Sequence, residues 1–207
     1  MRVAAVTTVC VVVTAAACSS RSPLSGIGDP GRSSPCTAAF EWDISRSWRL
    51  ITLDDLARVR RGDTLEIRAK PYKPMTSEVT VTGSRNAPSR SEVLTALRER
   101  TRTPLAAPGT STARLARKAE VTFRAKGAEA VYFQGLEAVT ATYRYRCTAD
   151  GAGADRGTGH VATWDPRSLT VGLIDCLAPA RDNPDSEPAE LALKLRCPGD
   201  SPAVRTS

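Results

Sequence analysis

The sequence has little that points to an enzyme or a metalloprotein. Its 207 residues include a single histidine, His160, and no Cys-x-x-Cys pair, which argues against the usual zinc clusters. It also lacks the G-x-S-x-G turn of α/β-hydrolases and any glycine-rich phosphate loop. No run reaches the roughly 18–20 apolar residues of a membrane-spanning helix. These absences argue against an integral membrane protein, and we predict no metal site and no cofactor.

The first 17 residues have the pattern of an export signal. Arg2 supplies the early positive charge, and residues 3–17 are Val, Ala and Thr with one Cys, a run too short to span a bilayer. The string AACSS over 16–20 resembles a bacterial lipoprotein signal, in which the cysteine becomes the lipidated first residue. We therefore predict a signal peptide over 1–17, palmitate-type lipidation of Cys18, and an extracytoplasmic protein held at the cell membrane by its lipid. Simple secretion is the alternative.

The remaining chain divides by composition. Residues 18–35 hold the lipidated cysteine and a stretch dominated by Ser, Gly and Pro, which predicts a flexible tether. A single β-rich domain is expected over 36–200, followed by a disordered tail over 201–207.

Four cysteines lie within this predicted domain, and an even count in an exported chain predicts two disulfides with three possible connectivities. We predict Cys36–Cys147 and Cys176–Cys197. In a simple meander, the strands that end at Cys147 and Cys176 flank the strand over 158–164, so they lie about 9.6 Å apart. Bridged Cα atoms are rarely more than about 7 Å apart, which disfavours joining these two.

Apolar and polar residues alternate with a period of two in several segments. This pattern is typical of strands with one buried and one solvated face, and hence of antiparallel sheet. The fold class is therefore mainly β (α+β), an antiparallel sandwich or curled sheet with one to three short helices. The segments are 38–44, 65–70, 78–82, 119–126, 139–147, 158–164 and 169–176.

Helices are expected between and after these strands. Ser89 and Glu92 form a capping-box pattern at the start of a helix that Pro104 ends. Residues 52–61 fit either a short helix or an extended lead-in to the next strand. Residues 187–197 alternate like a strand but consist of strong helix formers, so we favour a helix there.

Positive charge gathers in one block. Residues 85–126 hold ten Arg or Lys against three Glu, whereas 148–207 is mildly acidic. A basic face attracts anionic lipid headgroups, wall phosphodiester polymers or nucleic acid. The plainer interpretation is an Arg-rich solvated surface, because the chain has 24 Arg against 5 Lys. The candidate polyanion contacts are Arg98, Arg100, Arg102, Arg114, Arg117 and Lys118.

Nucleic acid is not an expected partner. The alternation of Tyr and Arg over 143–146 places aromatic and basic side chains on opposite faces of a strand. A nucleic-acid groove needs both on one face, so that bases stack beside bound phosphates.

Four runs carry a resemblance to a known group. VYFQG at 131–135, VTATYRYRC at 139–147, the pair Thr163-Trp164 and GLIDC at 172–176 are similar to small actinobacterial secreted lipoproteins of unassigned function. The resemblance covers roughly the C-terminal half and includes no catalytic signature. It implies a location at the cell surface and nothing about chemistry.

Together these patterns predict a cell-surface, lipid-anchored binding or interaction module of unknown ligand, and they favour this over an enzyme without excluding catalysis. Its expected partners are the membrane, through the lipid anchor, and an anionic envelope polymer or a surface protein. The alternative is a secreted hydrolase that uses His160 or a pair of carboxylates.

Overall fold

A computed structural model describes residues 37–83, 87–115, 118–122, 128–148 and 155–204. All of them belong to one unit over Ser34–Ser207. The predictions for the signal peptide, Cys18, the tether and Arg117 fall outside the described residues.

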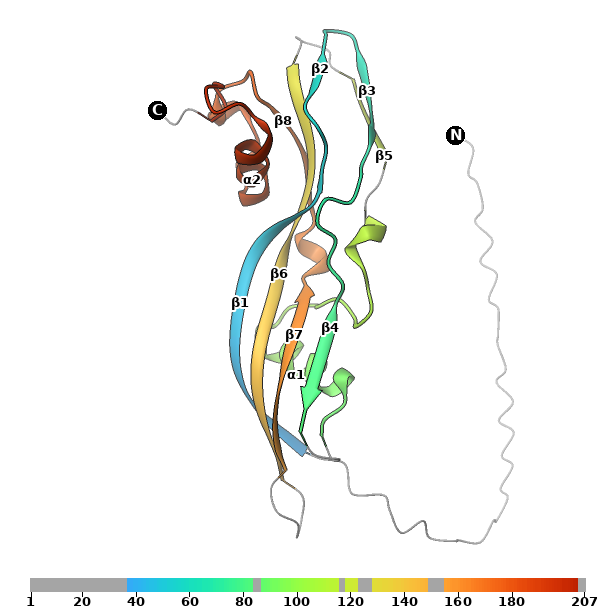
Figure 1. The fold of residues 1–207 in the computed structure, drawn as a ribbon, viewed down its shortest axis with the longest axis vertical. Helices are drawn as coiled ribbons and strands as arrows, with labels where there is room; N and C mark the ends of the chain where they lie inside the picture. The colour runs from blue at the N-terminus through green and yellow to red at the C-terminus, as the bar shows by residue number, and fades with distance from the viewer. Residues whose placement is uncertain (1–36, 84–86, 116–117, 123–127, 149–154, 205–207) are drawn as a thin grey trace, which may run out of the picture. The chain divides into compact units, whose positions relative to one another are not determined.

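The fold is mainly β, as expected, and takes the form of an open antiparallel sheet rather than a sandwich (Figure 1). The long strand β6 is its centre, and β1 followed by β2 lines one side of it. On the other side, β8 pairs with the first part of β6 and β7 with the second, and β4 pairs with β7. The six strands are β1 (Thr37–Leu53), β2 (Ala57–Val59), β4 (Glu78–Thr82), β6 (Ala128–Thr148), β7 (Arg156–Trp164) and β8 (Thr170–Asp175). A separate two-stranded sheet joins β3 (Thr64–Arg68) to β5 (Lys118–Thr122).

Every strand expected from alternation is present, but β6 begins at Ala128, well before the expected start at residue 139. The reason is that its first part is covered on both faces. Val131, Tyr132, Phe133 and Gln134 are consecutive and all buried, so the period-two signal vanishes there.

Two α-helices form where the sequence predicted them, one from its capping box and one from its composition. In α1 (Arg90–Thr101), the Ser89 hydroxyl accepts a hydrogen bond from the Glu92 N–H, and the Glu92 carboxylate accepts one from the Ser89 N–H. In α2 (Glu187–Arg196), Ser186 caps the first turn. Three 3-10 turns complete the helical content of the described residues: η1 (Thr112–Leu115), η2 (Pro166–Ser168) and η3 (Ala180–Asp182). No helix in these ranges is long and apolar enough to cross a membrane.

The helical alternative for residues 52–61 is wrong, and the extended alternative is confirmed. Thr52 and Leu53 end β1, and β2 follows on the same side of β6. The Thr52 hydroxyl donates to Gln134 Oε1 at 3.0 Å within the core. Pairing with β6 therefore outweighs the helix propensity of this short segment.

The two faces of β6 are covered differently along its length. On one face, Val131 and Phe133 pack in a core cluster with α2 residues, and Val139 to Tyr145 pack in a cluster with the apolar side of α1. On the other face, Leu136 and Ala138 are buried against Trp164 and neighbouring loop residues, but the side chains beyond residue 140 are solvent-accessible. We call this exposed area the open face. It consists of Glu41, Asp43, Thr80, Thr82, Thr142, Arg144, Arg146, Arg156, Thr158 and His160.

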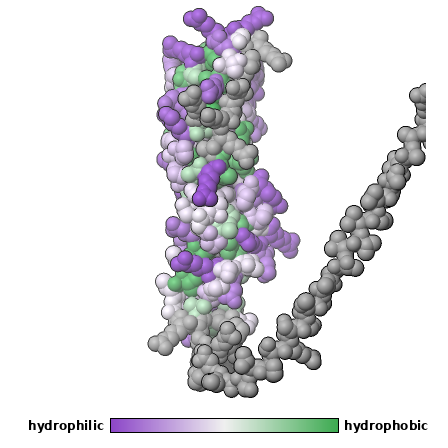
Figure 2. Space-filling model, turned by 90° about the vertical axis from the view of Figure 1, so that its right-hand side faces the viewer, coloured by the Kyte–Doolittle hydropathy of each residue, from purple (hydrophilic) through white to green (hydrophobic). Residues whose placement is uncertain are grey.

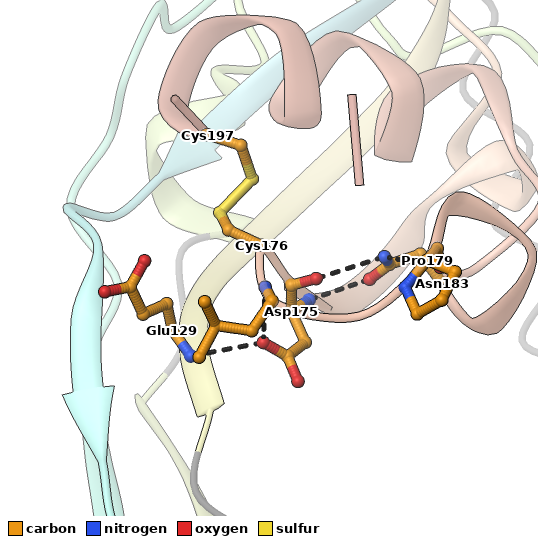
Figure 3. The surroundings of a disulfide bond; sticks show 7 residues. Glu129, Asp175, Cys176, Pro179, Asn183 and Cys197 are labelled. Atoms are coloured by element: carbon orange, nitrogen blue, oxygen red, sulfur yellow. Dashed lines mark hydrogen bonds between the residues drawn. A yellow bond between two sulfur atoms is a disulfide. The ribbon is translucent and has the colours of Figure 1, made fainter. Parts of the chain in front are cut away.

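The predicted disulfide between Cys176 and Cys197 is confirmed, with a Cα–Cα distance of 5.4 Å (Figure 3). It joins the end of β8 to the end of α2. Beside it, Asn183 Oδ1 accepts from the Asp175 N–H at 2.7 Å, and Asp175 Oδ1 accepts from the Glu129 N–H at 3.1 Å. The bridge and these hydrogen bonds fix α2 and the η3 turn against the sheet.

The strand order behind the disulfide prediction was wrong, although the pairing of Cys176 was right. The strand β8 pairs with β6 and not with β7, so no meander brings Cys147 and Cys176 within two strand spacings. The Cys176 N–H donates to the carbonyl of Glu129, 18 positions before Cys147 on β6. That separation is about 60 Å along a strand. Cys147 is disulfide-bonded, and its predicted partner, Cys36, lies outside the described residues.

The domain extends past the expected boundary at residue 200. Ser201 and Ala203 are buried, and Ala203 belongs to the core cluster beneath α2, with Val204 packed against it. The expected tail over 201–207 is therefore wrong over its first four positions.

Seen from the right-hand side of Figure 1, hydrophobic areas lie between hydrophilic ones (Figure 2).

Candidate functional site

The basic residues chosen from charge density do not share one element. Arg98 and Arg100 lie on α1, Arg102 is its C-cap, Arg114 lies on η1, and Lys118 begins β5. Arg98 is engaged structurally, because its guanidinium donates to the Leu105 carbonyl at 2.6 and 3.2 Å. Arg100, Arg102 and Arg114 are exposed, while Arg117 and the side chain of Lys118 lie outside the description.

Among the described residues, His160 has no neighbour suited to hydrolytic chemistry. It is exposed on β7, where its register neighbours are Thr80 and Thr142. In the part of the chain that the structure describes, its imidazole makes no hydrogen bond to a nucleophile or a carboxylate. Glu41 and Asp43 share one face of β1, but both are exposed, whereas a general-acid carboxyl usually sits in an apolar environment that raises its pKa.

Arginines gather instead on the open face, around a hollow of about 480 Å³ across β1, β6 and β7. The alternation of each strand sends Glu41, Arg144, Arg146, Arg156 and Thr158 to this face. A second hollow of about 500 Å³ adjoins it and shares Glu41, Arg144 and Thr158. Three guanidinium groups from two strands thus line one continuous depression.

Register places two of these arginines directly opposite each other. Arg146 on β6 pairs with Arg156 on β7, and both side chains are exposed on the same face. Like charges at directly opposite positions of an antiparallel pair destabilise it. Neither guanidinium makes a hydrogen bond or an ion pair with another described residue. Among the described residues, the donors of both guanidinium groups are thus available to a ligand.

The charge across the hollow changes along the strands. Residues that stand opposite one another on β1, β6 and β7 form rows across the sheet. The row nearest the end of β6 joins Ala39, Arg146 and Arg156, and Ala39 is too small to cover the guanidinium of Arg146. In the next row Glu41 stands opposite Arg144, and one row further Asp43 stands opposite Thr142. The basic end of the site is thus the outer one.

Tyrosines on the opposite face hold the backbone of this site. The Tyr143 hydroxyl donates to the Thr80 carbonyl at 2.8 Å, and burial raises the pKa of Tyr143 to about 12. Its ring lies against Gly159, where an added Cβ would overlap both Tyr143 Oη and the Thr80 carbonyl oxygen. Burial, with a smaller contribution from Asp155, also raises the pKa of Tyr145. These rings set the position of β7, and with it the position of Arg156.

Aromatic residues of β1 complete that support. Trp42 stacks on Phe40 with 5.2 Å between ring centroids, and the Trp42 and Tyr143 centroids are 5.0 Å apart. Such pairs add roughly 0.5–1.5 kcal/mol each beyond the area that they bury. The three strands beneath the hollow are therefore rigidly coupled, as a preorganised binding surface requires.

Threonines form the far rim of the open face. The Thr82 hydroxyl donates to the Thr158 carbonyl at 2.8 Å and lies 3.0 Å from the Thr158 hydroxyl. The Thr80 hydroxyl donates to the His160 carbonyl at 3.2 Å. These groups bind β4 to β7 and border the arginine-lined hollow with neutral polar atoms.

Comparison with protein-family models, with curated proteins and with solved structures found no match to this chain. The resemblance to actinobacterial lipoproteins stays a prediction. Charge density along the sequence does not reveal the arginine-lined hollow, because a connection separates Arg144 and Arg146 from Arg156 in the sequence. Only the register of β6 and β7 brings the three together.

Proposed function

We propose that this protein is an extracytoplasmic binding module that takes an anionic polymer of the cell envelope on its open face. The observation that carries the proposal is the Arg146–Arg156 pair, opposed in register and with no ion pair to any residue that the structure describes. An anionic oxygen placed between the two guanidinium groups accepts hydrogen bonds from both and removes their repulsion. Arginine suits this role because its planar fork matches phosphate and carboxylate oxygens.

The geometry favours an extended ligand over a compact one. Arg144 and Arg146 lie on one face of β6 and are therefore about 7 Å apart along the strand. They can meet successive anionic groups of a flexible chain, while Arg156 joins Arg146 on one of them. The site is an exposed surface, so binding should be moderate and should weaken as salt rises. Among polymers outside the cell, a phosphodiester chain fits this arrangement best.

The proposed location rests on the N-terminal pattern and on the disulfide. Export to an oxidising compartment agrees with the Cys176–Cys197 bridge, because such bonds are rare in the cytosol. Lipidation of Cys18 would hold the domain at the membrane surface, beside envelope polymers. Metabolic labelling with palmitate tests this part. Label that is lost in Cys18→Ser, with export intact, supports the anchor, and an unlabelled wild-type protein contradicts it.

A titration with a short poly(glycerol phosphate) oligomer tests the binding proposal. We expect measurable binding at low salt that falls at least about tenfold in Arg146→Gln/Arg156→Gln, since two charge-assisted contacts are lost. The matched control is Arg100→Gln/Arg102→Gln, which removes the same charge from the end of α1. Equal loss in both double variants, or unchanged affinity in the first, would show that the open face is not the site.

A further inference from the structure

The outer side of β1 is a sheet edge that no other described strand pairs with. At its far end, the Tyr72 N–H donates to the Ile51 carbonyl at 2.8 Å. From Ala38 to Leu50, no backbone group within the described ranges pairs with this side. The segment contains no proline and no lysine, and its ladder with β6 has no irregularity before Leu50. Proline, lysine and bulges are devices by which natural proteins protect such edges. This edge instead carries charges of both signs, Glu41 and Asp43 with Arg46 and Arg49, which a strand of matching charge pattern can pair.

We propose that this edge pairs with β1 of a second copy, antiparallel, about a two-fold axis at Ser45. Opposite residues of an antiparallel pair share a face, and two-fold symmetry makes every contact occur twice. With the axis at Ser45, Glu41 stands opposite Arg49 of the second copy, and Arg49 stands opposite its Glu41. Both side chains are exposed in the single chain and lie on the open-face side of β1.

Charge selects this register over its neighbours. An axis at Asp43 or at Arg46 would place that charged residue against its own copy. An axis at Trp42 would place Glu41 opposite Asp43, which is again a like-charge pair. An axis at Ile44 leaves Glu41 opposite a serine, without a charge pair. An axis at Arg46 also gives two opposite-charge pairs, Asp43 with Arg49, but it adds the like-charge contact of Arg46 with its own copy. The Ser45 axis alone among these gives two opposite-charge pairs and no like-charge pair, and opposite-charge pairs stabilise antiparallel ladders.

A second observation concerns the other face of the same edge. The same register places Trp42 opposite Trp48 of the second copy. A hollow of about 230 Å³ lies at this edge, lined by Trp48, Tyr72, Leu195 and their neighbours. Leu195 lies at the edge of the packed side of α2 and is 51% exposed, so the hollow presents apolar surface to solvent. The indole of Trp42 from the second copy would cover this apolar surface.

The proposed dimer does not depend on the proposed ligand, but it would change how the ligand binds. The two main sheets become one continuous sheet, and their open faces lie on the same side because the axis is perpendicular to it. Arg49 of the second copy then extends the row formed by Glu41 and Arg144. Two arginine-lined hollows on one surface would bind a long polymer with an avidity that one copy lacks.

A charge-reversal series on the purified full chain, followed by sedimentation equilibrium, tests the interface. Glu41→Arg places two like-charge pairs across the axis, and we expect the dimer to weaken about tenfold. Glu41→Arg/Arg49→Glu restores both pairs, so its dissociation constant should return to within about threefold of wild type. The control Glu78→Arg makes the same change on β4, at the opposite edge of the sheet, and should leave dimerisation unchanged. A wild-type chain that is monomeric throughout, or a double variant that stays as weak as Glu41→Arg, would overturn the proposal.

Cysteine cross-linking tests the register separately. Ser45→Cys places two cysteines opposite each other at the axis, with Cα atoms about 4.5–5.5 Å apart, a distance that a disulfide spans. We expect a reducible covalent dimer on mild oxidation, beyond the wild-type background. Ser47→Cys is the matched control, because in this register position 47 stands opposite Asp43 of the second copy. Its two introduced cysteines are then about 13 Å apart along the strands, too far to bridge. Equal cross-linking of both variants, or of neither, would contradict the axis at Ser45.

Discussion

Charge reversal at two neighbouring positions of β6 should change stability in opposite directions. Arg146 stands opposite Arg156, so Arg146→Glu replaces a like-charge pair by an opposite-charge pair. Arg144 stands opposite Glu41, so Arg144→Glu does the reverse. The two substitutions are chemically identical, lie on the same face of the same strand and are both exposed. What differs is the residues across the two ladders: Glu41 and Thr158 for Arg144, Ala39 and Arg156 for Arg146.

The magnitude follows from the energy of cross-strand charge pairs, about 0.2–1 kcal/mol each. Each reversal both removes one interaction and creates its opposite, so we expect Arg146→Glu to stabilise the fold by about 1 kcal/mol and Arg144→Glu to destabilise it by about as much. For a domain of this size, 1 kcal/mol corresponds to a change in Tm of roughly 2–4 °C. Both variants should nevertheless lose affinity for the anionic oligomer, because each removes a guanidinium from the hollow.

Urea unfolding at low ionic strength, repeated at high salt, measures these effects. The difference between the two variants should be about 2 kcal/mol at low salt and should shrink as salt screens the exposed charges. If Arg146→Glu stabilises the fold but weakens binding, Arg146 behaves as a functional residue that lowers the stability of the fold. Stability changes of the same sign in both variants would refute the cross-strand account of this site.

Three further predictions concern the scaffold. Cys176→Ser/Cys197→Ser opens a loop with a sequence separation of 21 and should lower the free energy of unfolding by about 3 kcal/mol in urea titrations; no change would show that the bridge does not constrain the unfolded chain. Gly159→Ala inserts a methyl group between a β4 carbonyl oxygen and a tyrosine hydroxyl and should cost about 2–4 kcal/mol, whereas Gly199→Ala meets no atom within 4 Å and should be nearly neutral. A hydrogen bond from the N-cap backbone lowers the pKa of Glu92 from 4.5, so its stabilising contribution is present above that pH and is lost as pH falls through the lowered value. The stability difference between wild type and Glu92→Gln should therefore shrink on acidification, and a difference that grows at low pH would contradict this sign.

Local rules predicted the elements of this fold where one signal dominated. The capping box at Ser89 and Glu92 located the start of α1 because the two hydrogen bonds depend only on residues three apart. Residues 187–197 were predicted as a helix from composition against an alternating pattern, and the structure bears this out. The apolar residues of that helix meet the core on one side, while Leu195 is left at its edge.

The sequence patterns did not predict the order in which the strands pair. Alternation shows that a segment is a strand but not which strand it joins, so β8 was expected beside β7 although it pairs with β6. The long reach of β6 explains the error, because two short strands pair in succession along one side of it. The buried stretch around Phe133 also carried no period-two signal, which hid the part of β6 that receives β8.

The candidate site shows the same limit. Alternation over 143–146 already separated the tyrosines from the arginines, and in the structure Tyr143 and Tyr145 are the buried pair. What it could not supply was the residue across the ladder. The Arg146–Arg156 pair depends on the register between β6 and β7, which arises from the whole sheet and not from a local motif.

The most direct test of the central claim is to observe the guanidinium groups themselves during binding. Arginine Nε–Hε resonances can be followed by NMR while the full chain is titrated with a short poly(glycerol phosphate) oligomer at low salt. The account predicts saturable shifts of the signals from Arg144, Arg146 and Arg156, which Arg146→Gln weakens at the other two. Shifts confined to Arg100 and Arg114, or no shifts at any arginine, would contradict it.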